Sequence, residues 1–118
     1  MSERHFNDTS DIEQRMEQAL TDYETHGTAW AVQNAERKYV ERCEEILLAQ
    51  KMNTHHELPV NQRKVMALAD PEYKEFVEGV KQAVSNENMS DVLMTKAKMT
   101  FEFLRSKLSL EKAKMEIR

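Results

Sequence analysis

The chain has few of the residues on which β-sheet folds and disulfide-linked folds depend: its 118 residues include two glycines, two prolines and one cysteine. Glycine and proline supply most tight turns, so this scarcity argues against all-β folds and against enzymes built on glycine-rich loops. A single cysteine excludes an internal disulfide. The charged opening, residues 1–5, holds no apolar signal segment, and 32% charged residues are too many for a membrane span. We therefore expect one soluble, cytoplasmic domain.

Helical spacing of apolar residues is what the sequence has instead. Ser10-Asp11-Ile12-Glu13 has the form of a capping box. We therefore expect residues 1–9 to be a frayed polar N-terminus and residues 10–118 to form a single helical domain. The first helix should end at Gly27 as its C-cap, and a second should run from Thr28 to about Met52. The apolar positions of that second helix are Val32, Ala35, Tyr39, Val40, Cys43, Ile46, Leu47 and Ala49.

The second half of the chain predicts further helices. Poor helix formers and a proline fill residues 53–59, and a short helix should follow from about Val60 to Ala69. Asp70 then suits an N-cap and Pro71 a first helical position. Polar residues 85–88 leave open whether residues 71–118 form one helix or two; we expect a break there. The predicted fold class is all-α, a small bundle of about five helices with a long C-terminal helix. The next helix should pack through Tyr73, Phe76, Val77, Val80, Ala83 and Val84.

The last helix carries apolar residues on two nearly opposite sides. A first stripe, typical of a coiled-coil seam, consists of Met94, Ala97, Phe101, Leu104 and Leu108. A second stripe consists of Met99, Phe103, Leu110 and Ile117. A helix with two apolar faces needs two partners, so we predict a homo-oligomer with the second stripe as its interface. The alternative is a monomer in which earlier helices cover both faces.

Charge is divided unevenly along the chain. Residues 1–25 hold seven acids and two bases, whereas residues 93–118 hold seven bases and three acids. Lys98, Arg105 and Lys112 recur every seven residues, and we call them the basic row. These bases would either pair with the acidic first helix and fix its orientation, or contact the phosphates of a nucleic acid. Under the second interpretation, Arg37, Lys38, Arg63 and Lys64 are secondary contributors.

Residue patterns for catalysis or metal binding are missing from the sequence. His55-His56-Glu57 could suggest a metal site, but adjacent histidines do not share a helix face and no third ligand is spaced to join them. Cys43 lies on an apolar helix face with no local base to activate it. The sequence holds no Walker loop, dinucleotide fingerprint or HExxH motif. We predict a protein that is not an enzyme and that binds no cofactor or metal.

From Ala35 onward the ordered combination of residues resembles small all-helical proteins that tailed bacteriophages encode in regions of recombination or replication genes. The residues that carry the resemblance are Ala35, Lys38, Tyr39, Leu47-Leu48-Ala49, Arg63, Ala67, Ala69, Asp70-Pro71-Glu72-Tyr73, Ala97, Phe101-Glu102 and Leu104-Arg105. Leu104 stands where that group usually has a tryptophan, and the acidic N-terminal helix is longer here. The architecture is similar to phage recombination mediators, which are small helical oligomers that bind single-stranded DNA and help to load a recombinase onto strands covered by single-strand-binding protein.

The resemblance implies binding and handover rather than chemistry, with Arg63, Arg105 and the neighbouring lysines as contacts. We therefore expect a phage-type accessory protein of DNA recombination or replication, located in the host cytoplasm. It would bind single-stranded DNA weakly and multivalently, and would contact a recombinase or a single-strand-binding protein. The alternative is a protein interaction module without nucleic-acid affinity, an adaptor or an inhibitor of a host protein, that docks through its acidic first helix.

Overall fold

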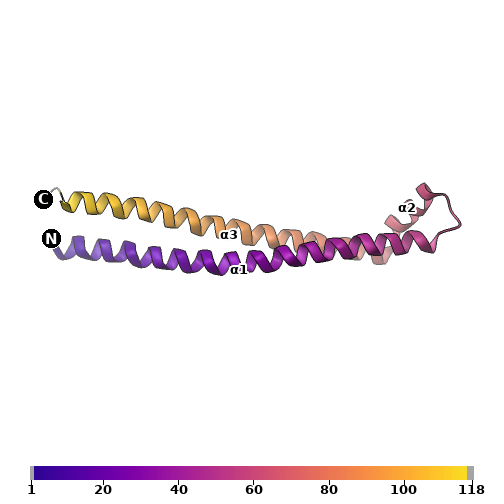
Figure 1. Ribbon diagram of the computed structural model, residues 1–118, viewed down its shortest axis with the longest axis horizontal. Helices are drawn as coiled ribbons and strands as arrows, with labels where there is room; N and C mark the ends of the chain where they lie inside the picture. The colour runs from indigo at the N-terminus through magenta and orange to yellow at the C-terminus, as the bar shows by residue number, and fades with distance from the viewer. Residues whose placement is uncertain (1, 117–118) are drawn as a thin grey trace. The chain divides into compact units, whose positions relative to one another are not determined.

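The computed structural model describes residues 2–116, with side chains from residue 9 onward. The described chain is all-α and has three helices: α1 (Ser2–Thr54), α2 (Val60–Ala69) and α3 (Pro71–Glu116) (Figure 1). The expected all-α class and long C-terminal helix are confirmed. The expected count of about five helices is wrong, because the chain continues as helix through two of the predicted breaks.

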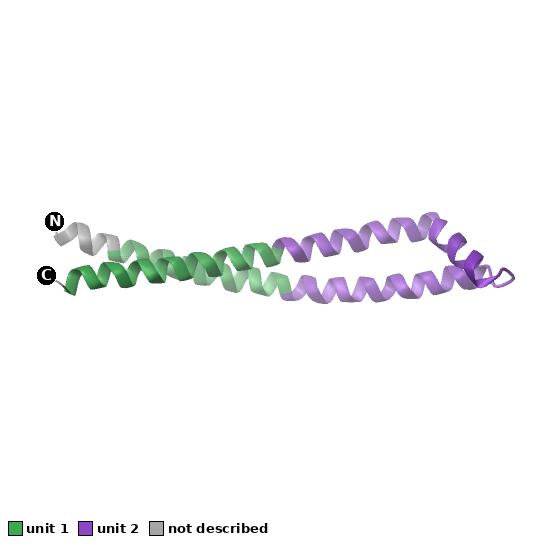
Figure 2. Cartoon of the chain, turned by 90° about the horizontal axis from the view of Figure 1, so that it is seen from above, with its two compact units in different colours: residues 1–30, 90–118 green, residues 31–89 purple. Residues whose placement is uncertain are grey.

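The chain divides into two compact units, and each long helix contributes to both (Figure 2). Unit 1 consists of residues 1–30 and 90–118, and unit 2 of residues 31–89. The acidic start of α1 and the basic end of α3 therefore belong to the same unit.

Unit 1 is built by α1 and α3 packed side by side. Ile12 and Ala19 of α1 and Ala97 and Leu104 of α3 are buried. The Thr9 hydroxyl lies 3.9 Å from the Met115 sulfur near the ends of the chain, and Gly27 lies close to Met94, so the two helices run antiparallel. All five residues of the first stripe are buried or half-buried, which confirms that this stripe packs within the chain.

Gly27 does not end a helix, which corrects the predicted boundary at 27–28. It lies inside α1, and its φ is not positive, so it does not adopt the left-handed backbone of a glycine C-cap. Nor does α1 begin at the predicted capping box: residues 2–9 are already helical. Met1 of the expected polar N-terminus lies outside the described residues.

Replacing Gly27 by alanine should stabilise the protein. A Cβ built at Gly27 would lie 3.5 Å from the Met94 sulfur, an ordinary van der Waals contact. Alanine is favoured over glycine by roughly 0.5–1 kcal/mol inside a helix. We expect Gly27→Ala to raise the free energy of unfolding by about that amount, measured by urea titration. Gly79→Ala, where the Cβ meets open space, is the matched control, and a loss of stability at Gly27 alone would restore the C-cap interpretation.

Unit 2 contains the predicted start of α3. The Tyr73 backbone N–H donates to the Asp70 carboxylate at 3.1 Å, and Pro71 is the first helical residue, so the predicted N-cap is confirmed. Tyr73, Val80 and Ala83 are buried, and Phe76 is half-buried, as the predicted packing face requires. The short helix α2 has the predicted bounds, and Ala67 is its buried residue.

The predicted break at residues 85–88 is absent, since α3 is continuous from Pro71 to Glu116. These polar residues do not interrupt the packing face: Glu87 lies on it, half-buried, and its carboxylate accepts hydrogen bonds from Arg37 and Asn34 of α1. A polar residue that finds charged partners on the facing helix can remain in the interface without ending the helix.

The apolar positions predicted for the second helix fall on two sides of α1. Val40 and Leu47 are half-buried, whereas Val32, Tyr39 and Ile46, seven residues apart, are exposed. These residues therefore do not form one packing face. Inside unit 2, Arg37 and Glu44 occupy positions of α1 that face α3. Arg37 pairs with Glu87, and Glu44 accepts a hydrogen bond from Tyr73.

Candidate nucleic-acid interface and oligomer surface

The basic row lies on α3 in unit 1. Lys98, Arg105 and Lys112 are all exposed, and successive members stand two helical turns apart, roughly 10 Å along the axis. Within the described part of the chain, none of the three makes an ion pair with a carboxylate or a side-chain hydrogen bond. No described carboxylate therefore neutralises their charges.

From residue 9 onward, the acidic segment of α1 forms no ion pair with these bases, although it belongs to the same unit. The ion pairs of unit 1, over the residues whose side chains are described, are Arg15 with Asp11 and Lys114 with Glu111. Each joins two residues of one helix rather than α1 to α3. Among the acids of α1 whose side chains are described, none therefore forms the ion pair with the row that this interpretation requires.

The secondary basic residues lie in unit 2 and on different helices. Lys38 is on α1, and Arg63 and Lys64 are on α2, so the structure does not gather them with the basic row in one unit. Lys38 and Lys64 are exposed. The Arg63 guanidinium donates to the carbonyl oxygens of Leu58 and His56, at 2.5 and 2.7 Å, and so holds the loop before α2. Arg63 is therefore a loop anchor in this structure.

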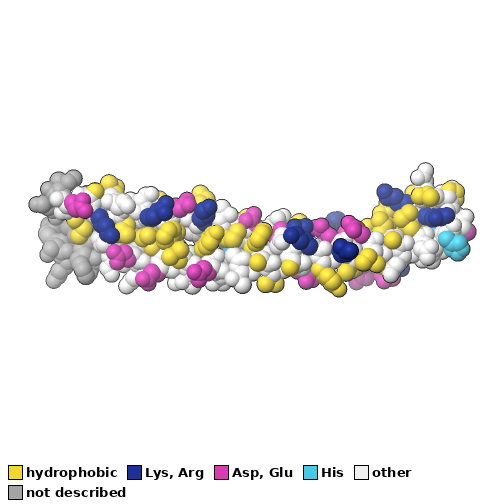
Figure 3. All heavy atoms as spheres, in the orientation of Figure 1, with side chains coloured by type: hydrophobic (Ala, Val, Ile, Leu, Met, Phe, Trp, Pro, Cys, Tyr) yellow, Lys and Arg dark blue, Asp and Glu magenta, His cyan; other side chains and the backbone are white. Residues whose placement is uncertain are grey.

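The second stripe is exposed on α3 in unit 1. Met99, Phe103 and Leu110 keep 64%, 67% and 57% of their surface accessible. Ile117, the fourth predicted member, lies outside the described residues. Val92, seven residues before Met99, is 61% exposed and is not a member of the predicted stripe, although the same spacing points to it. On the face of the molecule that Figure 3 shows, hydrophobic side chains lie beside Lys and Arg side chains.

Two open grooves meet at Phe103. One, of about 540 Å³, runs along α3 past Val92, Met99 and Phe103. The other, of about 500 Å³, lies between the helices of unit 1 and is lined by Ala19 and His26 of α1 and by Phe103 and Leu104 of α3, among others. Both have mainly apolar walls, which suits a side chain from another helix better than a polar small molecule.

Charged groups in unit 2 are used for packing. The Arg37 guanidinium donates to Glu87 and to Glu41, the latter at 2.9 Å. Hydrogen bonding to Arg37 holds the pKa of Glu87 below its ordinary value, and the same bond raises the pKa of Arg37. At the other end of unit 2, the Lys51 ammonium lies 2.8 Å from the Glu72 carboxylate and 3.4 Å from that of Asp70.

Two further contacts involve the start of α3. The Tyr73 hydroxyl donates to Glu44 at 3.0 Å, and its pKa is raised by burial and by that carboxylate. The pKa of Asp70 is lowered, chiefly because its carboxylate accepts the Tyr73 backbone N–H and also interacts with Lys51. These groups form hydrogen bonds and ion pairs with one another between α1 and α3. They therefore stabilise the packing of unit 2 rather than form a binding site.

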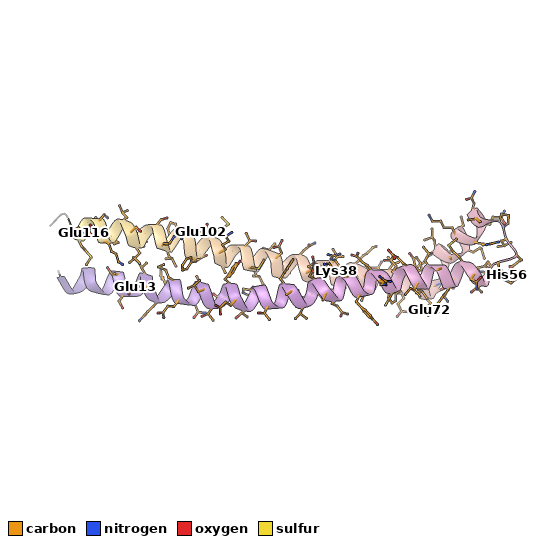
Figure 4. The ribbon with its side chains drawn as sticks, viewed as in Figure 1. Glu13, Lys38, His56, Glu72, Glu102 and Glu116 are labelled. Carbon is orange, nitrogen blue, oxygen red and sulfur yellow. The ribbon has the colours of Figure 1, made fainter. Side chains whose placement is uncertain are left out.

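The other candidate residues from the sequence do not form a metal site or a catalytic site in the described part of the chain. His56 lies beside Glu57 in the exposed loop, with 3.8 Å between Nδ1 and the carboxylate, and is labelled in Figure 4. Among the side chains of residues 9–116, no three His, Cys, Asp or Glu gather as metal ligands would. Cys43 is half-buried on α1. None of the described helices is both long and apolar enough to cross a bilayer.

Comparisons with known proteins identified no relative of this chain. A scan against protein-family models, a search of curated proteins and a search of solved structures each found no significant match.

Proposed function

We propose that this chain is a non-catalytic, homo-oligomeric accessory protein of DNA recombination or replication that binds single-stranded DNA through the basic row. The observation that carries the proposal is the row itself: three exposed cations at regular spacing on one helix, none of them neutralised by a carboxylate of the described chain. The process, and contacts with a recombinase or a single-strand-binding protein, follow from the resemblance to tailed-phage proteins.

Such a row suits a flexible strand. A single strand can bend so that phosphates in successive short stretches of it meet cations roughly 10 Å apart, whereas a duplex presents phosphates on a fixed curve. With a net charge of -4, the whole chain repels polyanions at long range, so one copy should bind weakly. Several copies in one oligomer would place several rows on one strand, and binding would gain from their effective concentration.

The test is a salt titration of binding to a fluorescently labelled oligonucleotide, read by anisotropy. Three phosphate contacts on a single strand account for a slope of about 2 in log affinity against log salt concentration. We expect the triple variant Lys98→Gln, Arg105→Gln, Lys112→Gln to weaken binding and to flatten the slope by about that amount.

The control is a triple variant at three exposed bases of unit 2 that are not predicted contacts, Arg42→Gln, Lys74→Gln and Lys81→Gln, which removes equal charge. It should change affinity less than the row variant. Absence of binding by the wild-type protein at about 50 mM salt, where electrostatic association is favoured, would end the nucleic-acid proposal. Equal effects of the two triple variants would show attraction by net charge without a defined site.

A second candidate function is supported by the acidic side of α1 in unit 1. Leu20 and Tyr23 are exposed there, close in sequence to the exposed carboxylates of Glu17 and Glu24. Apolar residues with acids beside them on α1 suit a basic, amphipathic partner helix, as an adaptor or inhibitor would require, although Leu20 and Tyr23 also line a groove with Lys98 and Arg105 of α3. The same titration separates the two functions, because this surface predicts no oligonucleotide binding at any salt concentration.

A further inference from the structure

The second stripe is part of a longer heptad pattern on the back of α3. Within the described residues, one line of positions is Lys96, Phe103 and Leu110, and the other is Val92, Met99, Ser106 and Ala113. Steps of three and four join them, and every one of these residues is exposed. We call these seven residues the outer seam. A helix with this spacing of apolar residues packs on another helix, and no other part of the described chain covers the outer seam.

The charges beside the outer seam discriminate between the two directions in which a second copy could pack. Glu102 flanks one side of it and Lys107 the other; both are exposed, and neither forms an ion pair within the described chain. Glu102 is labelled on α3 in Figure 4. In a parallel coiled coil, flanking residues five apart in sequence meet across the interface, so Glu102 of each copy meets Lys107 of the other.

An antiparallel arrangement has the opposite electrostatics. In an antiparallel pair, each flank of one helix faces the equivalent flank of the other. Lys107 and Lys114 of one copy would then face Lys107 and Lys114 of the other, and the flank that carries Glu102 would face its own equivalent. Like charges in such positions destabilise a coiled coil. Lys96 of one copy faces Lys96 of the other in the parallel, in-register arrangement. This costs stability, but the ammonium of a core lysine can reach water, and a shifted register would set each Lys96 against a different core residue.

We propose that two copies of this chain pack in parallel and in register through the outer seam, with Glu102 of each copy paired to Lys107 of the other. This deepens the proposed function, since it specifies the interface of the oligomer on which that function rests. The basic row lies on a different side of α3 from the outer seam, at positions closer to the first stripe, so assembly leaves it accessible in both copies. Assembly and nucleic-acid binding are therefore separable by substitution.

Charge reversal tests the pairing. Glu102→Lys or Lys107→Glu alone places like charges together twice in a symmetric dimer, and we expect the dissociation constant from sedimentation equilibrium to rise roughly tenfold. The double variant Glu102→Lys, Lys107→Glu should return it to near the wild-type value. Glu24→Lys and Lys74→Glu, exposed residues away from α3's outer seam, are the controls for net charge. Failure of the double variant to recover dimer formation, with helicity intact by circular dichroism, would overturn the pairing.

Cysteine cross-linking tests the direction. In a Cys43→Ser background, Val92→Cys and Ala113→Cys lie at equivalent core positions roughly 30 Å apart along α3. In a parallel, in-register dimer each variant alone forms a disulfide-linked dimer with oxidised glutathione. In an antiparallel dimer neither links to itself, although the mass in solution is that of a dimer. That result, or a wild-type monomer at tens of micromolar, would overturn the proposal.

The two proposals fail in different ways. If the protein cross-links at both positions but binds no oligonucleotide, the proposed nucleic-acid function is contradicted and the proposed interface is supported. A monomer that binds the oligonucleotide with the expected salt slope does the reverse. The triple Gln variant of the basic row should cross-link as efficiently as the wild-type background, and a loss of cross-linking in that variant would contradict the separation of the two surfaces.

Discussion

Replacing Phe103 by glutamate should convert the oligomer to a monomer. Phe103 is the most exposed of the three described residues of the second stripe and borders both grooves described above. An aromatic side chain buried in the centre of an interface contributes roughly 2–4 kcal/mol to association. Glutamate removes that contribution and also buries a charge without a partner. We expect the dissociation constant to rise at least about 100-fold, measured by sedimentation equilibrium or light scattering.

Tyr39→Glu is the matched control for this prediction. Tyr39 is an aromatic residue of nearly equal exposure, 66%, on α1 in unit 2, and the substitution introduces the same charge. It should leave the oligomer formed through α3 intact. If both variants lower the mass equally, assembly depends on net charge or on both exposed surfaces, and the second stripe loses its special role. If Phe103→Glu keeps the wild-type mass, the stripe is not an interface.

Local chemistry explains which parts of the fold can be predicted from the sequence. Asp70 and Pro71 are capping residues whose effect depends on adjacent backbone atoms, so the predicted start of α3 is correct. The first stripe of α3 is predictable because its members are apolar and repeat regularly. Gly27 misleads because a glycine inside a long helix and a glycine at a helix end look the same in the sequence, and only φ distinguishes them.

Long-range pairing explains what the sequence does not show. The packing positions of α1 in unit 2 include Arg37 and Glu44, which look like surface residues until Glu87 and Tyr73 of α3 face them. These charges hide the apolar periodicity of α1, and the polar stretch at residues 85–88 resembles a break for the same reason. The sequence predicts Arg63 as a nucleic-acid contact but gives no sign of its hydrogen bonds to the loop, because its partners there are backbone carbonyl oxygens rather than side chains.

Leu104→Ala should cause the largest loss of stability, and a second leucine of the same helix shows why. Leu104 is 4% exposed in the core of unit 1, whereas Leu110, on the opposite side of α3, is 57% exposed. Truncating a buried leucine removes its burial and leaves a cavity, at a cost of about 3 kcal/mol. The change in helix propensity is the same at both positions, so the difference between the two variants measures burial alone.

Urea unfolding at several protein concentrations separates packing within a copy from packing between copies. The effect of Leu104→Ala should be about 3 kcal/mol at every concentration, because it acts within unit 1. Leu110→Ala should change the stability of the dissociated chain by no more than about 0.5 kcal/mol. At concentrations where the oligomer forms, Leu110→Ala should become more destabilising, since unfolding is then linked to dissociation. Equal losses for both leucines at low concentration would mean that Leu110 packs within the chain, and the second stripe would then be core instead of interface.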